Sequence, residues 1–147
     1  MEGIGMAYTE TEIEVRYAET DQMGVVYHAN YLIWMELGRT RFIESLGLRY
    51  FDMEQLGYLS PVIDVAIHYG KPLRYGQNAI VKTWLEEYDG VRVTYGYEIR
   101  YAESGEIAIT GETKHVCVTK DTFKPVALKR VLKEWHDKYQ KAVEGAK

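Results

Sequence analysis

Two consecutive segments of this sequence have hydrophobic patterns with different periods. From Glu12 to Tyr17 apolar and charged side chains alternate, which is typical of a half-buried strand with Tyr17 on its apolar face. From Asn30 to Leu46 the apolar side chains follow helical spacing and cover more than one stripe. We therefore predict a strand followed by a long helix that is covered on most sides. Gly38, which lowers helix propensity, marks a point where another segment approaches closely.

The rest of the chain reads as four more strands and a closing helix. The predicted strands span Val62–Tyr69, Ala79–Tyr88, Val91–Tyr101 and Glu106–Thr119. Asp89-Gly90 is a strong hairpin signal, so the last three strands form an antiparallel meander. Gly96 and Gly111 lie inside strands, where glycine often marks a bend or bulge. An amphipathic helix is predicted from Leu128 to about Ala142.

This order of elements predicts an α+β fold in which a curved antiparallel sheet wraps around one apolar helix. With 147 residues and no internal repeat or linker, residues 1–147 are expected to form a single domain. The edge strands of such a sheet need cover, and pairing with a second subunit is a common way to provide it.

Charge and cysteine usage narrow the class of protein. The formal net charge is −4, which gives no general attraction to nucleic acid or to an anionic membrane. The single cysteine, Cys117, excludes an internal disulfide and fits a reducing compartment. The first six residues have no basic region and no long apolar run, and no segment is long enough to span a membrane. We expect a cytoplasmic protein that is not inserted in a membrane.

Asp21 is the first candidate for chemistry. It lies just before Gly24 and the predicted helix, in an apolar loop. An ordinary aspartate has a pKa near 3.9, so at neutral pH it is an anion that can attack a carbonyl or take a proton from water. The alternative is a carboxylate that only caps the turn.

His28 and Tyr17 are the other candidates near Asp21. The backbone N–H of His28, close to the helix start, can hold an oxyanion, although a structural histidine is the alternative. Tyr17 can hydrogen-bond a carboxylate or simply pack. The histidines show no zinc-ligand spacing, and no phosphate-binding loop or nucleophile elbow is present. We therefore expect a carboxylate that works without metal or cofactor.

Three blocks in order carry a resemblance to a known family. They are Tyr17–Tyr31, Gly57–Val62 followed by Tyr69–Gly76, and Lys124–Leu128. This pattern resembles hotdog-fold acyl-CoA thioesterases of the YbgC / 4-hydroxybenzoyl-CoA thioesterase group. The resemblance implies a hotdog fold, homodimers with a continuous sheet that pair into homotetramers, and active sites at the subunit interface.

The resemblance also implies roles for individual residues. Asp21 would be the catalytic carboxylate, with His28 and Tyr17 as its catalytic neighbours and the backbone N–H at or beside His28 as the oxyanion donor. The substrate-binding residues implied are Gly24, Val25, Tyr27, Tyr31, Pro61 and Arg92. The position after Tyr75-Gly76, which is often acidic in the family, is Gln77, and only Arg92 remains near the third hairpin to meet the nucleotide of coenzyme A. Other candidates for that contact are Lys71, Arg74 and Arg100.

The activity implied is hydrolysis of an acyl-CoA thioester, with Asp21 as nucleophile or as general base on water. A hotdog module that binds acyl-CoA without cleaving it is the alternative. A hydratase on the same fold would pair a histidine with an acid in a different motif, which is absent. The acyl group is left open, because pocket depth depends on packing between subunits around Tyr31, Met35 and the segment Tyr50–Pro61.

Overall fold

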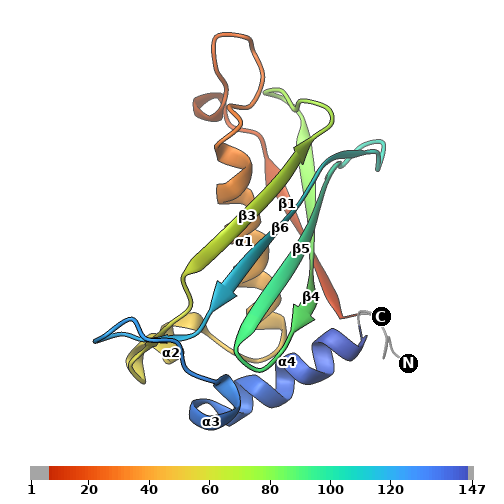
Figure 1. Cartoon of the computed structure of the whole chain (residues 1–147). Helices are drawn as coiled ribbons and strands as arrows, with labels where there is room; N and C mark the ends of the chain where they lie inside the picture. Colours follow the sequence, from red (N-terminus) through yellow and green to blue (C-terminus); the bar gives the residue numbers. More distant parts are fainter. Residues whose placement is uncertain (1–6, 146–147) are drawn as a thin grey trace.

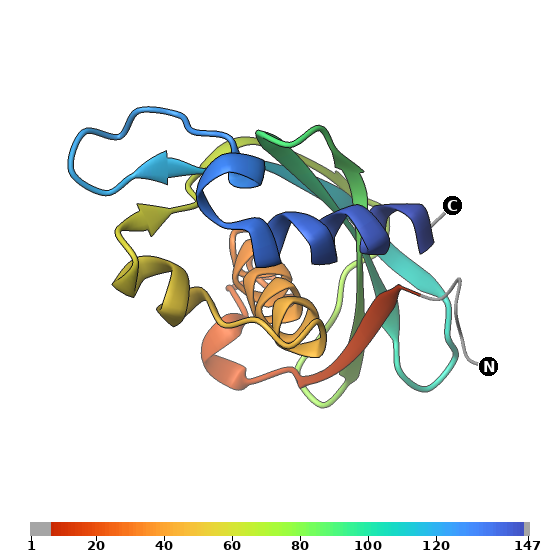
Figure 2. The same cartoon turned by 90° about the horizontal axis from the view of Figure 1, so that it is seen from below.

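A computed structural model describes residues 7–145 and places one long helix inside a curved sheet. Helix α1 (Asn30–Ser45) has the predicted bounds to within one residue at its end. Its buried side chains face the sheet, and Trp34 and Met35 are fully enclosed. Figure 1 shows α1 behind the strands, and Figure 2 shows it nearly end-on with the sheet curving around it and α4 lying across.

Five antiparallel strands make the main sheet, in the order β1-β4-β5-β6-β3. They are β1 (Tyr8–Glu14), β4 (Asn78–Tyr88), β5 (Arg92–Tyr101), β6 (Ile107–Val116) and β3 (Val62–Tyr69). Strands β2 (Tyr58–Leu59) and β7 (Val118–Thr119) form a separate pair. The remaining helices are α2 (Tyr50–Gln55), α3 (Leu128–Val131) and α4 (Lys133–Gly145). The predicted meander β4-β5-β6 is confirmed, and β3 lies at one edge of the sheet.

Glycines inside these elements mark close contacts. A Cβ at Gly38 would lie 2.5 Å from Thr83 Oγ1, so the predicted close approach to α1 is confirmed and comes from β4. A Cβ at Gly96 would meet the indole of Trp84, and one at Gly111 would meet Met35 of α1. The sheet is curved as expected from these glycines, but the strand register is regular at both of them. The register shifts of β4 and β5 fall instead between Leu85 and Glu87 and between Ile99 and Arg100.

Three elements differ from the predictions in their bounds. Strand β1 begins at Tyr8 instead of Glu12 and ends at Glu14. Tyr17 begins a short 3-10 helix, η1 (Tyr17–Glu19), with its side chain 75% exposed instead of packed. The side chain of Glu19 bonds the backbone N–H of Arg16 and turns the chain there. The last predicted strand is divided at Cys117 into β6 and β7, and the terminal helix is divided at Leu132 into α3 and α4.

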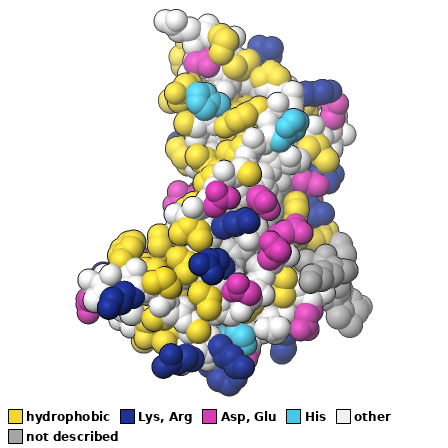
Figure 3. Space-filling view, viewed as in Figure 1, with side chains coloured by type: hydrophobic (Ala, Val, Ile, Leu, Met, Phe, Trp, Pro, Cys, Tyr) yellow, Lys and Arg dark blue, Asp and Glu magenta, His cyan; other side chains and the backbone are white. Residues whose placement is uncertain are grey.

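One side of the molecule is apolar and uncovered. On α1 the side chains of Leu32, Ile33 and Leu37 are 39–49% exposed, so the expectation that the helix is covered on most sides is wrong for a single chain. On β3 the side chains of Val62, Ile63, Val65 and Tyr69 are exposed as well. Figure 3 shows hydrophobic side chains along this edge and at the lower left over α2. Edge strands of this kind present unpaired backbone groups to another chain.

Two expectations concern the ends of the chain. The reading of residues 1–6 lies outside the described residues, and the single domain over 1–147 therefore stays a prediction. Among residues 7–145, no helix is long and apolar enough to cross a membrane.

Candidate active site

The loop between η1 and α1 presents the carboxylate of Asp21 at a tight turn. The N–H of Asp21 donates to the carbonyl of Val25 at 2.9 Å, and the N–H of Gly24 donates to the carbonyl of Asp21 at 2.9 Å. Gly24 has φ +79°, which favours glycine at this position. The side chain of Asp21 accepts a 2.9 Å bond from the N–H of Met23 through Oδ1. Asp21 therefore does cap a turn, and Oδ2 has no hydrogen-bond partner among residues 7–145.

A cavity of about 310 Å³ opens beside Asp21. Its wall is mostly apolar, because Val25, Val26, Tyr31 and Ile109 line it together with segments of the following loop. His28, Tyr69, Met23 and residues 70–72 complete the lining. An apolar wall of this kind can accommodate an acyl group beside the Asp21 carboxylate.

His28 lies at the start of α1 on the same cavity. Its ring is 6.1 Å from that of Tyr69 and 4.4 Å from that of Tyr27, measured between ring centroids. The backbone N–H groups of His28 and Ala29 donate to no acceptor within residues 7–145, whereas the N–H of Asn30 already donates to Tyr27. Free N–H groups at a helix N-terminus attract a developing negative charge.

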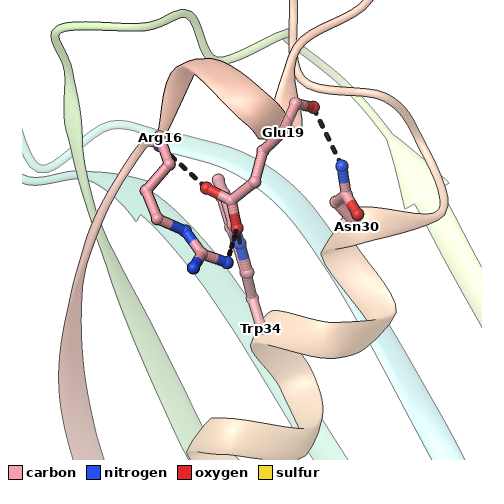
Figure 4. Close-up of polar contacts among 4 residues, drawn as sticks. All are labelled: Arg16, Glu19, Asn30 and Trp34. Atoms are coloured by element: carbon pink, nitrogen blue, oxygen red, sulfur yellow. Dashed lines mark hydrogen bonds and ion pairs between the residues drawn. The ribbon is translucent and has the colours of Figure 1, made fainter.

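Glu19 holds this stretch in place (Figure 4). Its buried carboxylate accepts bonds from Trp34 Nε1 at 2.9 Å, from the N–H of Arg16 at 2.8 Å and from the guanidinium of Arg16 at 3.1 Å. Its carbonyl accepts from the side chain of Asn30 at 2.9 Å and from the N–H of Tyr27 at 2.8 Å. Glu19 thus ties both ends of the Asp21 loop to α1.

The pKa of Glu19 reflects these contacts. Burial alone would raise the pKa of this carboxyl group, but the hydrogen bonds from Trp34 and Arg16 outweigh burial and lower it below its usual range. The sequence prediction did not include Glu19. The sequence does show an acidic residue two positions before Asp21. However, sequence alone does not distinguish a buried carboxylate beside a short turn from a solvated one.

The structure brings together five of the nine predicted site residues around the cavity. Asp21, Val25, His28 and Tyr31 line it, and Tyr27 stacks on His28. Gly24 forms the turn behind the cavity. Tyr17 lies outside it, with its ring 5.7 Å from that of Tyr75. Pro61 and Arg92 are not part of it either: Pro61 precedes β3, and Arg92 begins β5 opposite Val116.

The basic candidates for the coenzyme A nucleotide have different surroundings. Lys71 lines the Asp21 cavity and forms an ion pair with Glu106. Arg100 is paired with Glu98 at 2.6 Å, and Arg92 is exposed at the end of its strand. No group of three or more His, Cys, Asp or Glu side chains in the described part of the chain is arranged to hold a metal ion.

A second cavity of about 250 Å³ lies at the opposite end of β3. Ser60, Pro61 and Val62 line it where β3 begins, and Glu36 and Arg39 of α1 line it as well. The remaining lining residues are Thr40, Ile43, Tyr50, Tyr95, His115, Trp135 and Tyr139. The family resemblance placed Pro61 and the segment Tyr50–Pro61 near the acyl group, and these residues contribute to this cavity. Sequence patterns gave no indication of its other lining residues, because they come from segments spread over most of the chain.

A chain of hydrogen bonds runs through the floor of the second cavity. His115 Nδ1 lies 3.2 Å from the carbonyl of Ser60, which can only accept, so Nδ1 carries the proton. His115 Nε2 then accepts from Thr113 Oγ1 at 2.9 Å, and Thr113 accepts from the hydroxyl of Tyr97 at 2.7 Å. Tyr97 accepts from Arg39 at 3.0 Å. Every bond in this chain has a fixed direction while His115 is neutral.

The titration of His115 gives a test of this chain. Burial, helped by the charge of Arg39, lowers the pKa of His115 to about 4, whereas an unfolded histidine titrates near 6.5. Between these values the unfolded chain binds a proton that the folded chain does not, so stability falls as pH falls. We expect His115 to contribute about 3 kcal/mol above pH 6.5, lost on acidification to about pH 4.

The measurement is chemical denaturation from pH 4 to 7.5. His115→Gln, which keeps a donor and an acceptor but does not titrate, should lose this part of the pH dependence. His68→Gln removes an exposed histidine and serves as the control. Equal pH dependence in wild type and His115→Gln would contradict the assignment of a buried neutral imidazole.

Comparison with known proteins places this geometry among thioester hydrolases. The sequence model of the thioesterase-like superfamily matches residues 15–136. YneP of Bacillus subtilis (strain 168), whose name assigns it to the acyl-CoA thioesterases, is 54% identical over 93% of this chain and 99% of its own length. The acyl-CoA thioesterase YbgC of Haemophilus influenzae is 29% identical over 82% of this chain and 88% of its own.

A solved structure agrees with these sequence matches. The DHNA-CoA thioesterase from Staphylococcus aureus superposes with a TM-score of 0.88 and 49% identity, covering 91% of this chain and 89% of that chain. The predicted α+β hotdog fold is thereby confirmed.

Proposed function

This chain belongs to the thioesterase-like superfamily, and from that premise we propose that it hydrolyses an acyl-CoA thioester to a carboxylic acid and coenzyme A at Asp21. Its relatives support the thioesterase activity. The observation that supports Asp21 as the catalytic group is its position. It is the carboxylate on the cavity at the start of α1, and its Oδ2 accepts no hydrogen bond from residues 7–145.

The proposed chemistry uses the two sides of the cavity. The thioester carbonyl lies between Asp21 and the free N–H groups of His28 and Ala29. Attack on the carbonyl carbon, by the carboxylate or by a water that it activates, moves negative charge onto the carbonyl oxygen. The N–H groups and the helix dipole stabilise that charge. The C–S bond then breaks, and coenzyme A leaves as the thiol.

We propose an aromatic acyl group as the substrate class. The Staphylococcus aureus relative is a DHNA-CoA thioesterase at 49% identity. Tyr31 and Tyr69 line the Asp21 cavity with their rings packed against each other, 5.9 Å apart between centroids, and an aromatic wall of this kind favours contact with a flat ring. A module that binds acyl-CoA without cleaving it is the rival, and the unoccupied Oδ2 of Asp21 supports hydrolysis instead.

We propose that two copies of the chain form a dimer through β3, with the active sites at the interface. The support is the exposed apolar edge of β3 and the adjacent exposed side of α1, both of which a two-fold partner would cover. A homotetramer of two such dimers and a cytoplasmic location complete the proposal. A hollow of about 420 Å³ beside Trp84 on the outer face of the sheet supports further association, and the buried free thiol of Cys117 supports a reducing compartment.

The test is release of free thiol from a panel of acyl-CoAs with short, long and aromatic acyl groups, including DHNA-CoA. We expect turnover to be fastest on the aromatic members. Absence of thiol release from every member would contradict hydrolysis, and binding of the same compounds without release would favour the rival. Sedimentation of the purified protein measures its mass, and a monomer at assay concentrations would contradict the dimer.

A further inference from the structure

The second cavity is lined by charged and aromatic side chains that lie too far from Asp21 of the same chain to share a substrate with it. We propose that it is the acyl-group subsite for Asp21 of the partner subunit, and that Arg39 and Glu36 select an acyl ring that carries a hydroxyl group. This inference rests on the proposed function and on the dimer, and it adds the residues that determine substrate specificity.

Within one chain the two cavities are too far apart to share a substrate acyl group. On β6, Ile109 lines the Asp21 cavity and pairs with Tyr69, whereas His115 lines the second cavity and pairs with Val62. His115 is six positions after Ile109 along β6. At a rise of about 3.4 Å per residue, these two residues are about 20 Å apart. An acyl group of one or two rings cannot span that distance from Asp21.

Pairing of β3 with its two-fold copy brings the cavities together. Ile67 and Tyr69 point to the side of the sheet that carries α1: Ile67 lies beside Gly111 and Met35, and the ring of Tyr69 is 5.9 Å from that of Tyr31. A continuous sheet must keep inner side chains opposite inner side chains. Pairings that use nearly the whole strand are therefore centred either on Val65 or on Ala66.

Both registers have the same consequence for the site. Both centres bring Tyr69 level with residues 61–63 of the partner subunit, the segment in which β3 has a register shift between Val62 and Asp64. Neighbouring strands are only about 4.8 Å apart. Tyr69 lines the Asp21 cavity and Pro61 lines the second cavity, so the two cavities abut across the interface. Taken separately, the two cavities have volumes of about 310 and 250 Å³, which lie at or below the lower end of the range of about 300–1,000 Å³ for ligand pockets.

The lining of the second cavity points to a hydroxylated ring. Tyr95, Trp135 and Tyr139 form its buried floor. Arg39 lies over the ring of Tyr95, with its guanidinium carbon 5.9 Å from the centroid, and uses one N–H for Tyr97. Guanidinium has five N–H donors, so others remain for a ligand.

Arg39 also lacks a compensating carboxylate. Within residues 7–145 it forms no ion pair with Asp or Glu, and neither does Glu36 with Lys or Arg, although both line the same cavity. A hydroxyl group between them accepts from Arg39 and donates to Glu36, which satisfies both charged groups. In the single chain Arg39 is half-buried and Glu36 is exposed, on the side of α1 that the proposed partner covers. Once that side is covered, a ring without the hydroxyl leaves both charged groups unsatisfied, and such sites discriminate strongly against the analogue that lacks the group.

One side of this subsite is fixed by the hydrogen-bond chain. Ser60 accepts from His115 through its carbonyl and donates to Tyr50 through its N–H at 2.9 Å. The segment that begins β3 is thus held from both sides. Its position relative to the partner's Asp21 follows from the strand pairing.

The first experiment compares kcat/KM for matched pairs of substrates: benzoyl-CoA with 4-hydroxybenzoyl-CoA, and 2-naphthoyl-CoA with its 1,4-dihydroxy derivative. We expect wild type to prefer a hydroxylated member by about tenfold or more. Arg39→Gln and Glu36→Gln should each remove most of this preference, because each variant loses a bond to the hydroxylated member and no longer leaves a charge unsatisfied beside the unhydroxylated one. Arg41→Gln, on the same helix but paired with Glu44, is the control and should keep the preference. An unchanged preference, or an equal loss on both members of a pair, would overturn the assignment.

The second experiment tests which subunit supplies Arg39. Asp21→Asn and Arg39→Gln chains are combined in a mixed dimer through two affinity tags. If the site is shared, one of its two sites contains native Asp21 and native Arg39. The mixed dimer should then show the wild-type hydroxyl preference at about half the wild-type turnover. If both residues served one chain, the preference would stay as low as in Arg39→Gln, and the proposal would be wrong.

These results separate the inference from the proposed function. Hydrolysis at Asp21 would be contradicted if wild type released no thiol, or if Asp21→Asn released thiol as fast as wild type. Asp21-dependent hydrolysis with an unaltered preference in the Arg39 and Glu36 variants rejects the subsite alone.

Discussion

Asp21→Asn is expected to lower kcat for acyl-CoA hydrolysis by about 10³-fold, with a much smaller change in KM. An amide neither attacks a thioester carbonyl nor takes a proton from water at neutral pH. The loop should keep its shape, because the Asn Oδ1 can still accept the bond from the N–H of Met23 that Asp21 accepts at 2.9 Å. Release of coenzyme A thiol measures the rate, and thermal unfolding checks the fold. A rate within a few-fold of wild type, with an intact fold, would remove Asp21 from the mechanism.

The same site allows a test of how Asp21 acts. In ¹⁸O-labelled water, a general base delivers label to the product acid in the first turnover. A nucleophilic Asp21 forms a mixed anhydride, so label enters its carboxylate when the anhydride is hydrolysed and reaches product in later turnovers. Mass analysis of the product after one turnover and of the peptide containing Asp21 after many turnovers distinguishes the two routes.

Glu19→Ala is expected to destabilise the folded protein by about 3 kcal/mol and to lower turnover as well. The change leaves Trp34 Nε1 and the N–H of Arg16 without their acceptor, and a buried donor without a partner costs about 1–3 kcal/mol. It also frees the η1 turn from α1, so Asp21 is no longer held against the helix start. Denaturant unfolding and thiol release are the measurements. Glu14→Ala, an exposed acid at the end of β1, is the control.

The pH dependence of this variant gives an independent check. Because the folded-state pKa of Glu19 is lowered, its contribution is fully present above the ordinary value near 4.5 and is lost as pH falls through the lower folded value. Wild type should therefore lose stability relative to Glu19→Ala on acidification below about pH 4.5. A constant difference between the two proteins at all pH values would mean that the Glu19 carboxylate is not stabilised by its donors.

The spacing of apolar side chains along the chain predicted much of this fold, because a strand or helix that is buried on one face repeats its apolar residues with its own period. Helix α1 and strand β3 have nearly the predicted bounds. The error at Tyr17 has a different source. Alternation continued through residue 17, but the bond from the N–H of Arg16 to the Glu19 side chain ends the strand earlier. The position of the Glu19 side chain depends on its bond from Trp34 and on the surrounding packing. The alternation of apolar and charged residues carries no information about those contacts.

The candidate site residues also divide into those that the sequence predicted and those that it did not. Asp21, His28 and Tyr31 are close in sequence and meet at one cavity, as predicted. Arg39, His115 and Tyr139 are far apart in sequence and meet only after the sheet has closed around α1. Apolar side chains on β3 and on one side of α1 predicted burial, yet they are exposed in the single chain. A hydrophobic pattern does not state which chain would supply the cover.

The edge position of β3 has a consequence for substrate size. A slip of one residue in its pairing would turn inner side chains to the outer face, so stable registers differ by two residues, or about 6.8 Å. With the cavities shared as proposed, the distance from Asp21 to the partner's Arg39 changes only in such steps, each about the length of one aromatic ring. Acyl-group length in proteins built this way would then be set in discrete increments by strand register, and a cavity mutation could tune it only within one step.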